Sequence, residues 1–219
     1  MTAPAEPQGD YFRQERDDLF LCLDRAAAPG RALEIGCGEG RFGARLCAMG
    51  FEVHGVESDP GAAAVAGSVL HRVLCEDIEA AALPYPEEHF DLLVCADVLE
   101  HLRDPWTVLR RLRVLLKRGG TAIASVPNAQ YFPVVAGLLA GRFRYRDSGV
   151  LDRTHLRFFT RESARELFEQ AGFAIEAMPV SYPGRPVSRA ILGTLDLASF
   201  GMLRGFLTGQ TLIRARRIS

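Results

Sequence analysis

Short apolar runs alternate along this sequence with segments in which apolar residues recur every three or four positions. The short runs predict strands over residues 31–35, 51–56, 72–75, 90–95, 121–126, 173–180 and 211–218. The recurring pattern predicts helices over residues 10–27, 40–49, 60–70, 105–118 and 161–171. Strands that are separated by helices indicate right-handed βαβ units. We therefore expect an α/β fold with a parallel sheet covered by helices on both faces.

Two segments break this alternation. Residues 129–159 are irregular and rich in aromatic side chains, and residues 187–208 are apolar nearly all round. We predict that 129–159 is a lid or acceptor-binding insert, and that 187–208 packs across the sheet edge or forms a dimer contact. A membrane-surface position is an alternative for 187–208, although its few basic residues would attract anionic lipid only weakly. Residues 1–9 are expected to form a loose arm, and 1–219 a single domain.

The composition limits the partners and the location. Of the 219 residues, 48% are hydrophobic and 24% are charged, with a net charge of −1. This is ordinary globular composition and provides no basic field for nucleic acid. Five cysteines without Cys-x-x-Cys spacing indicate free thiols rather than a disulfide framework or a zinc site. We see no secretion signal and no apolar run of transmembrane length, so we expect a cytoplasmic protein.

A glycine-rich loop, Gly-Cys-Gly-Glu-Gly, directly follows the first predicted strand and opens a helix. Gly36, Gly38 and Gly40 allow a tight turn and a close approach of the backbone to a ligand. Dinucleotide-binding enzymes need a further glycine where this chain has Arg41, which argues against a nicotinamide cofactor. Glu34 would repel a pyrophosphate, and it suits a ligand that carries an ammonium or sulfonium group.

Glu57 supplies the second element of the predicted ligand site. It follows the second predicted strand, about 20 residues after the glycine loop begins, where a carboxylate can accept hydrogen bonds from both ribose hydroxyls. The sequence therefore predicts a cationic cofactor that carries a ribose and no diphosphate. The structural alternative is a glycine turn that binds no ligand.

These features and several motifs further along the chain resemble the class I S-adenosylmethionine-dependent methyltransferases. The matching segments are Leu33–Gly40, Val56–Asp59, Cys75–Ile78, Phe90–Leu102 and Ser125–Asn128. The resemblance implies a Rossmann-like three-layer sandwich with a mostly parallel seven-stranded sheet whose last strand is antiparallel. It also implies that the cofactor is S-adenosyl-L-methionine. The cofactor-binding residues that it implies are Glu34, Gly36, Cys37, Gly38, Gly40, Glu57, Ser58, Asp77, Ile78 and Cys95.

Transfer of a methyl group to a hydroxyl needs a group that removes a proton. We predict that Asp97, His101 and His155 lie beside the acceptor, and that a histidine acts as general base because its unperturbed pKa of about 6.5 suits that task. The structural alternative is that His101 only shapes the loop after the fourth strand and that His155 belongs to a surface loop.

The same residues, together with Glu100, also have the composition of a divalent-metal site. Similar segments occur in metal-dependent O-methyltransferases of ubiquinone biosynthesis and of small-RNA 2′-O-methylation. In this chain the first acid is Asp97 rather than a glutamate, which shortens its reach. Our primary prediction therefore names no metal ligand, and a metal site stays an alternative.

The resemblance and the two histidines predict O-methylation of a small molecule or of a sugar or glycan precursor. One alternative is metal-assisted O-methylation of a catechol or vicinal diol, and another is a non-catalytic S-adenosylmethionine-binding scaffold. A nicotinamide oxidoreductase ranks third. The expected partners are a small-molecule or sugar acceptor and a second copy of the chain in a homodimer, with no nucleic acid and no integral membrane segment.

Overall fold

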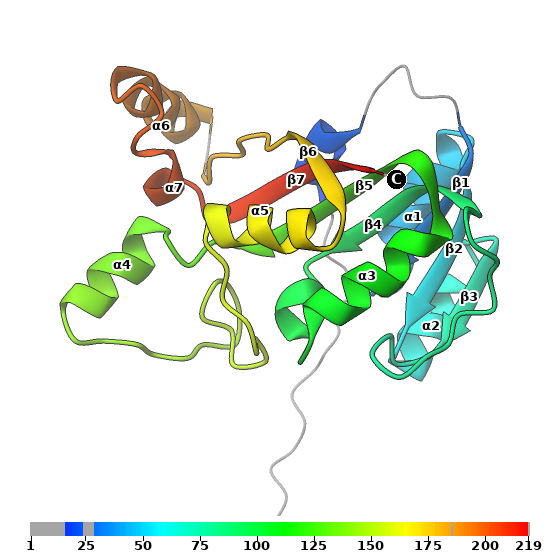
Figure 1. Cartoon of the computed structure of the whole chain (residues 1–219). Helices are drawn as coiled ribbons and strands as arrows, with labels where there is room; N and C mark the ends of the chain where they lie inside the picture. The colour runs from blue at the N-terminus through cyan, green and yellow to red at the C-terminus, as the bar shows by residue number, and fades with distance from the viewer. Residues whose placement is uncertain (1–15, 24–28, 185, 219) are drawn as a thin grey trace, which may run out of the picture.

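The strands of the chain form one mixed sheet. In a computed structural model, which describes residues 16–23, 29–184 and 186–218, they pair in the order β3-β2-β1-β4-β5-β7-β6 (Figure 1). Their bounds are β1 Arg31–Ile35, β2 Glu52–Glu57, β3 Arg72–Cys75, β4 Phe90–Ala96, β5 Leu116–Pro127, β6 Phe173–Ala177 and β7 Gln210–Arg217. The pairs among β1 to β5 are parallel, whereas β7 runs antiparallel to both β5 and β6. This confirms the predicted seven-stranded α/β sheet with an antiparallel last strand.

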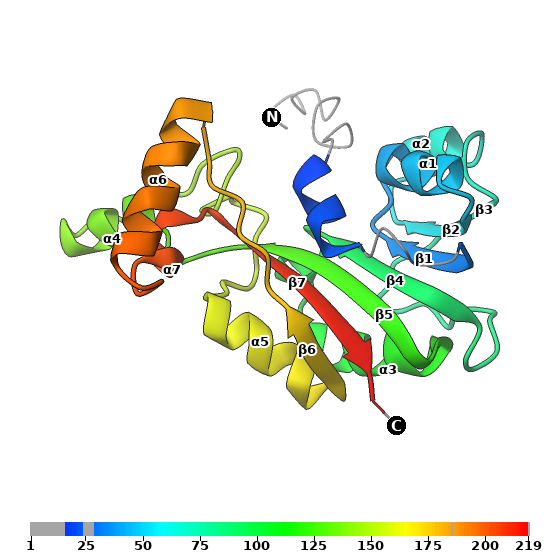
Figure 2. The same ribbon diagram turned by 90° about the horizontal axis from the view of Figure 1, so that it is seen from above.

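Helices cover both faces of this sheet. The α-helices are α1 Arg41–Ala48, α2 Pro60–Ala66, α3 Pro105–Leu115, α4 Phe132–Leu139, α5 Arg161–Gln170, α6 Pro186–Ala198 and α7 Arg204–Leu207, and the 3₁₀ helices are η2 Asp17–Cys22 and η3 Leu99–His101. Figure 2 shows η2, α1 and α2 on one face of the sheet, and α3 and α5 on the other. The predicted three-layer sandwich is therefore confirmed.

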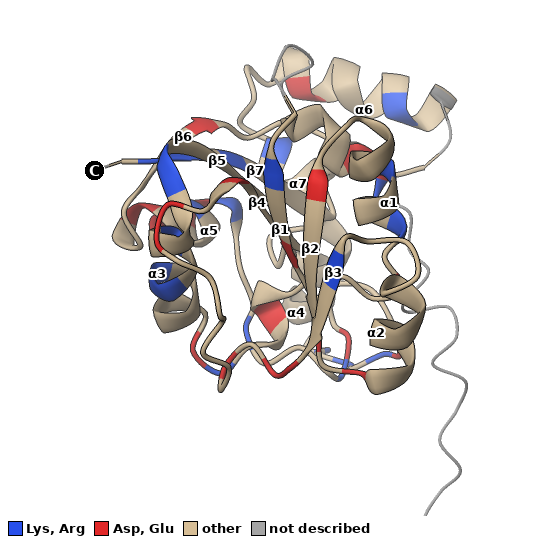
Figure 3. Ribbon diagram, turned by 90° about the vertical axis from the view of Figure 1, so that its right-hand side faces the viewer, with Lys and Arg blue, Asp and Glu red and all other residues tan. Residues whose placement is uncertain are grey.

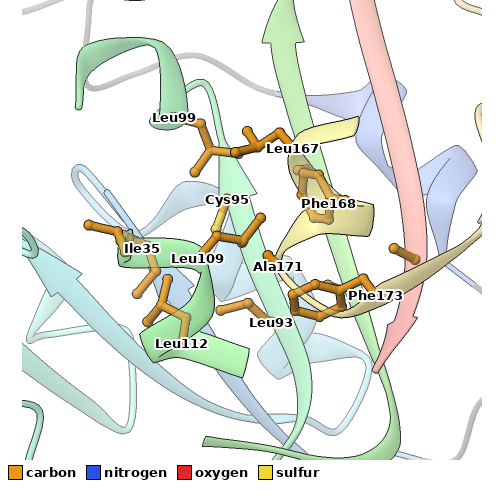
Figure 4. Close-up of a cluster of buried hydrophobic side chains, with 14 of the residues drawn as sticks. Ile35, Leu93, Cys95, Leu99, Leu109, Leu112, Leu167, Phe168, Ala171 and Phe173 are labelled. Atoms are coloured by element: carbon orange, nitrogen blue, oxygen red, sulfur yellow. The ribbon is translucent and has the colours of Figure 1, made fainter. Parts of the chain in front are cut away.

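The core is divided by the sheet into two apolar clusters. Leu93 and Cys95 of β4 pack with side chains of α3 and α5 (Figure 4), whereas Leu92 and Val94 pack in the cluster formed with η2, α1 and α2. Successive side chains of a strand point to opposite faces. Because both faces of β4 are buried, its sequence is a nearly continuous apolar run instead of an alternating one.

Side-chain caps fix where several helices begin. Asp59 and Asp104 each accept the backbone N–H three residues further on, and a proline follows each of them. Thr160 and Ser163 form a reciprocal capping box at the start of α5. These caps satisfy N–H groups that have no partner within the helix, which explains why these helices start at the predicted positions.

The helix predicted to run to the glycine pair at 119–120 is too long, and the strand predicted from residue 121 is too short. The helix α3 ends at Leu115, and Leu116 is the first residue of β5, where it pairs with Phe90 across an irregular register. An apolar residue at this position satisfies the helical period and the strand equally well, so the pattern could not locate the boundary.

Other element boundaries also differ from the prediction. The helix predicted over 60–70 ends at Ala66. Of the helix predicted over 10–27, residues Asp17–Cys22 are seen as the 3₁₀ helix η2. The predicted arm, residues 1–9, lies outside the described residues.

Both atypical segments contain helices. The segment 129–159, predicted to be irregular, includes α4, while α6 and α7 occupy most of 187–208. These three helices gather beyond one end of the sheet, away from α1 and α2 (Figures 1 and 2).

A few side chains attach these helices to the rest of the fold. The Asn128 side chain donates to the carbonyls of Gly205 (2.7 Å) and Thr208 (2.8 Å). Asp196 accepts from the hydroxyl of Tyr182 (2.6 Å) and from Nε of Arg204 (2.9 Å). These polar contacts hold α6 and α7 near the end of β5.

Acidic and basic segments are interspersed over the face shown in Figure 3. This agrees with the near-zero net charge on which the prediction of no nucleic-acid partner rests. None of the described helices has the length and apolar character required to cross a membrane.

Candidate cofactor and acceptor site

A cleft of about 1080 Å³ opens where β1, β2 and β4 end. The carboxyl ends of parallel strands are the usual ligand-binding edge of an open α/β sheet. Residues predicted to bind the cofactor line this cleft, namely Glu34, Gly36, Cys37, Gly38, Glu57, Ser58, Asp77 and Ile78. Its wall also includes Asp97, His101 and His155, which were predicted to lie beside the acceptor. One cleft therefore brings both sets of predicted residues together.

The glycine loop adopts a backbone that side chains would strain. Gly36 and Gly38 have φ angles of +64° and +52°, in the left-handed region that glycine enters without steric cost. A Cβ on Gly36 would lie 2.5 Å from Cγ2 of Val98. The loop can thus follow its tight path, with bare backbone toward the cleft, only with glycine at position 36.

Glu57 is held between two loops at the end of β2. Its Oε2 accepts the backbone N–H of Gly38 (2.8 Å), and its Oε1 accepts the backbone N–H of Asp59 (2.9 Å). The hydroxyl of Ser58 lies 3.4 Å from Oε1. Because each carboxylate oxygen has further lone pairs, this fixed carboxylate can still accept hydrogen bonds from a ribose.

Glu34 is a buried acid at the cleft wall. Burial raises its pKa to about 8, the neighbouring carboxylate of Glu57 adds to this rise, and the backbone N–H of Gly43 opposes it. The Oε2 atom of Glu34 has no hydrogen-bond partner among the described residues. A buried acid of this kind suits a cationic ligand, whose charge would favour its ionised form.

The loop after β3 supplies the far wall of the cleft. Asp77 accepts the backbone N–H of Glu79 through Oδ1 (2.9 Å), which orders the loop. Ile78 is buried beside it and offers an apolar surface. Cys37 is also buried, and burial raises the pKa of its thiol, so it contributes shape rather than a charge.

Two residues assigned to the cofactor do not line this cleft. Gly40 is the N-cap of α1 and has a φ angle of +81°. Because it has no Cβ, Ala66, the last residue of α2, and Val69, just after α2, can pack against it. Cys95 is buried in the core, where burial raises its thiol pKa to about 12. The sequence pattern alone does not distinguish a position that packs in the fold from one that lines the cleft.

Asp97 lines the cleft and has a left-handed backbone, φ +52°. Its Oδ1 accepts from the hydroxyl of Ser125 (3.0 Å), and its other oxygen forms an ion pair with the guanidinium of Arg16. Strained backbone of this kind is common at functional sites. Because both oxygens are engaged by protein groups, the geometry favours a positioning role for Asp97 over direct proton transfer. Arg16 was not among the predicted site residues, because it lies 81 positions before Asp97 in the chain.

His101 and His155 form a pair in the cleft. Their ring centroids are 4.8 Å apart in an edge-to-face arrangement. Nδ1 of His101 lies 3.3 Å from the carbonyl of Thr154, and Nδ1 of His155 lies 3.0 Å from the carbonyl of Val150. Because a carbonyl can only accept, each Nδ1 carries the proton and each Nε2 keeps its lone pair when the ring is neutral. Burial and the neighbouring His155 lower the pKa of His101, which keeps it neutral near pH 7.

Glu100 is the second residue that the primary prediction left out. It is 1% exposed, and neither carboxylate oxygen has a hydrogen-bond partner in another described residue. Burial raises its pKa to about 8. One ligand atom each from Glu100, His101 and His155 lies within 4.8 Å of the others. The structure thus groups three of the four residues considered as metal ligands, and Asp97 is not part of this group.

The sheet order and the cleft at its carboxyl edge define an α/β protein built to hold a nucleoside. Residues 8–178, well over half of the chain, match the profile of a family described as "Methyltransferase domain". The chain belongs to this methyltransferase family, and S-adenosylmethionine is the cofactor that this membership implies.

Curated relatives agree with this assignment. The chain is 30% identical over 176 residues to a probable S-adenosylmethionine-dependent methyltransferase of Mycolicibacterium smegmatis, which covers 80% of this chain and 64% of the relative. It is 31% identical over 161 residues to a ubiquinone biosynthesis O-methyltransferase of Ruegeria pomeroyi, covering 71% of this chain and 64% of the relative. The chain thus spans 64% of the length of these two relatives.

Solved structures share the fold. A methyltransferase from Archaeoglobus fulgidus aligns with a TM-score of 0.65 and 18% identity, over 95% of this chain and 97% of the other. The [4+2]-cyclase SpnF aligns with a TM-score of 0.62 and 21% identity, over 91% of this chain and 80% of the other. Because a cyclase shares the architecture, the fold alone does not define the reaction.

Proposed function

We propose that this chain transfers the methyl group of S-adenosylmethionine to a hydroxyl oxygen of a small molecule or of a sugar or glycan precursor. The observation that carries the proposal is the pairing of His101 and His155 in the same cleft as the glycine loop, each with its Nδ1 on a backbone carbonyl. With the ring proton on Nδ1, Nε2 is the basic atom of each neutral histidine in the cleft wall.

The cofactor supplies a methyl group on a positively charged sulfur. Gly36 and Gly38 would admit its amino-acid end, Glu57 would bind the ribose hydroxyls, and Asp77 with Ile78 would hold the adenine. Glu34 would place a negative charge near the ammonium or sulfonium group. These residues act by holding the cofactor in one orientation, which is the main requirement of an in-line displacement.

On the acceptor side, a histidine Nε2 would take the hydroxyl proton as the oxygen attacks the methyl carbon. The O–H bond and the S–CH₃ bond break, the O–CH₃ bond and the Nε2–H bond form, and the spent cofactor leaves as a neutral thioether. Asp97 and Arg16 would fix the wall beside this centre. The name of the Ruegeria pomeroyi relative supports transfer to oxygen.

A specific observation favours metal-assisted O-methylation of a catechol or vicinal diol as the second candidate. Glu100, His101 and His155 present one carboxylate and two imidazoles within 4.8 Å, and the buried carboxylate has no hydrogen-bond partner in another residue that the structure describes. These residues fit a divalent ion, whose charge would favour ionised Glu100 and lower the pKa of a bound hydroxyl. The two imidazoles would then act as ligands instead of bases.

The experiment that tests the proposal is an acceptor screen. The purified chain, with S-adenosylmethionine, is offered sugar nucleotides, phenolics and quinone precursors, and release of the demethylated cofactor is measured with mass analysis of the acceptor. Acceptor-dependent release and a methylated oxygen support the proposal. Cofactor binding without release with any acceptor would instead support the non-catalytic scaffold.

A chelation arm separates the two catalytic candidates. After exhaustive removal of divalent ions, full activity would support base catalysis by histidine. Loss of activity that returns when a divalent ion is restored would support the metal-assisted reaction.

We also propose that the chain is cytoplasmic and forms a homodimer. The exposed apolar side chains of α6, such as Val187 and Leu197, support a protein contact. Light scattering on the purified chain measures its mass, and a monomer at micromolar concentration would contradict the dimer.

A further inference from the structure

We propose that the chain has a second ligand site, a binding site for a borderline divalent transition ion such as Zn²⁺, formed by Glu52, His54 and His71. These residues, here called the amino-edge cluster, lie at the start of β2 and just before β3. The cleft lies at the opposite ends of the same strands, and none of the three residues lines it. The site is therefore separate from the methyltransferase chemistry and does not depend on it.

The three ligand atoms of the amino-edge cluster converge on one point. Oε1 of Glu52 is 2.9 Å from Nε2 of His54 and 3.6 Å from Nε2 of His71, and all three atoms lie within 4.8 Å of one another. Ligand atoms that are each about 2.0–2.2 Å from a zinc ion are separated by about 3–4 Å. A small adjustment of the exposed His71 and Glu52 side chains would close the shell around an ion.

A further contact orients His54. This ring is buried, and its Nδ1 lies 3.0 Å from the hydroxyl oxygen of Tyr85. With its proton on Nδ1, the ring donates to Tyr85 and turns the Nε2 lone pair toward Glu52. A zinc-binding histidine commonly donates its other ring N–H to an oxygen in this way. Nε2 also lies at hydrogen-bond distance from Oε1 of Glu52 (2.9 Å), so an ion would replace that hydrogen bond and leave the ring proton on Nδ1.

The surrounding charges indicate the class of ion. Glu52 is the acid of the cluster. Arg72 stacks over Tyr85, and Asp91 is paired with Lys117. One carboxylate among cationic neighbours is a poor site for Mg²⁺ or Ca²⁺, which prefer oxygen ligands. Two imidazoles suit Zn²⁺ and its neighbours in the transition series.

An ion at this place would tie the first residue of β2 to the turn before β3. The other ends of these two strands carry Glu57 and the loop with Asp77, which form part of the cleft wall. We therefore expect bound Zn²⁺ to raise the melting temperature of the chain, since an ion that binds only the folded state stabilises it.

The test uses the full chain after chelator treatment, titrated with Zn²⁺ against a coloured competing chelator. The background carries His101→Ala and His155→Ala, which remove two members of the other candidate metal group. One equivalent of Zn²⁺ should still bind and raise the melting temperature. His71→Ala and Glu52→Gln should each weaken this binding by at least about tenfold, whereas Glu87→Gln, an exposed acid in the β3–β4 connection, should leave it unchanged.

No Zn²⁺ binding in this background, or equal affinity with and without His71→Ala, would overturn the proposal. If the double background does not fold, the otherwise unchanged chain gives the same answer. There, His71→Ala should reduce the number of bound Zn²⁺ ions by one, and an unchanged number would overturn the site.

Discussion

The part of the cleft that we propose for the cofactor and the part that we propose for the acceptor, here called the cofactor side and the acceptor side, are built in different ways. On the cofactor side, Glu57 lies at the end of β2 and accepts two backbone N–H groups. One comes from Gly38 of the glycine loop and the other from Asp59 in the loop after β2. On the acceptor side, the insert 129–159 supplies Asp147, Asp152 and His155 to the cleft wall. The same insert contains α4, whose Leu139 is 86% exposed. The cofactor side is formed by strand ends and the loops that follow them, whereas the acceptor side is formed largely by a segment outside the strands.

This difference separates general binding from specific recognition. A cofactor site made of strand ends and bare backbone can stay constant while the attached segments change. Two attachments bring the insert to the cleft, since the N–H groups of Leu156 and Arg157 both donate to the carbonyl of Glu100. His155 directly precedes this anchor, so its position depends on the insert being docked. The following changes should affect the two sides unequally.

The largest effect is expected for His155→Ala on the acceptor side. Loss of a general base lowers turnover by about 10²–10⁴-fold, so kcat with an acceptor from the screen should fall by that factor. The dissociation constant for S-adenosylmethionine should change little, because the glycine loop and Glu57 are untouched. His89→Ala, outside the cleft, is the matched control and should retain wild-type kcat. Equal losses in both variants would refute the role of His155.

On the cofactor side, Gly36→Ala should show the reverse pattern. The left-handed backbone and the clash with Val98 would distort the loop, at a backbone cost of about 1–2 kcal/mol before the clash is counted. We expect cofactor affinity to fall at least about tenfold in a calorimetric titration. Gly193→Ala, in α6 with room for a Cβ, should bind the cofactor normally. Unchanged affinity in Gly36→Ala would show that the loop does not bind the cofactor.

Glu100→Gln should reveal a pH-dependent stability difference. The folded-state pKa of Glu100 is raised to about 8 from its ordinary 4.5, so the folded state binds a proton that the unfolded state releases between these values. The stability of the wild type relative to Glu100→Gln should therefore fall as pH rises from about 4.5 to 8, by on the order of 1 kcal/mol or more. Urea unfolding at pH 5.5 and 8.5, with chelator present, measures this. A pH-independent difference would contradict the buried, unpaired state of Glu100.

The smallest effect is expected for Leu139→Ser in α4. This leucine is 86% exposed, so the free energy of unfolding should change by less than about 0.5 kcal/mol. Leu109→Ala in α3 removes a fully buried side chain and should cost about 2–5 kcal/mol. Similar losses in the two variants would show that α4 is packed in solution against something that covers it.

The sequence predicted the sheet better than the attached segments, for physical reasons. The bounds of β1 and β3 agree with the prediction, because a buried parallel strand needs an apolar run and the neighbouring turns end it. Leu116 was misassigned because an apolar residue fits both periods. The helix α4 was missed because its residues, Phe132–Leu139, are apolar on most sides and give no helical stripe.

For the site, motif spacing located the residues but not their contacts. Glu57 and Asp77 were placed at the cleft because strand ends converge there. The ion pair between Arg16 and Asp97 joins positions 81 residues apart, and no local pattern encodes it. Gly40 and Cys95 occupy motif positions that serve packing, which only the three-dimensional arrangement reveals.

The most direct test of the central claim is a calorimetric titration of the purified chain with S-adenosylmethionine, its demethylated thioether and a nicotinamide dinucleotide. The account predicts one site per chain for the first two ligands, no binding of the dinucleotide, and proton release with S-adenosylmethionine near pH 7 as Glu34 ionises beside the cation. Tight binding of the dinucleotide without binding of the sulfur nucleosides would contradict it.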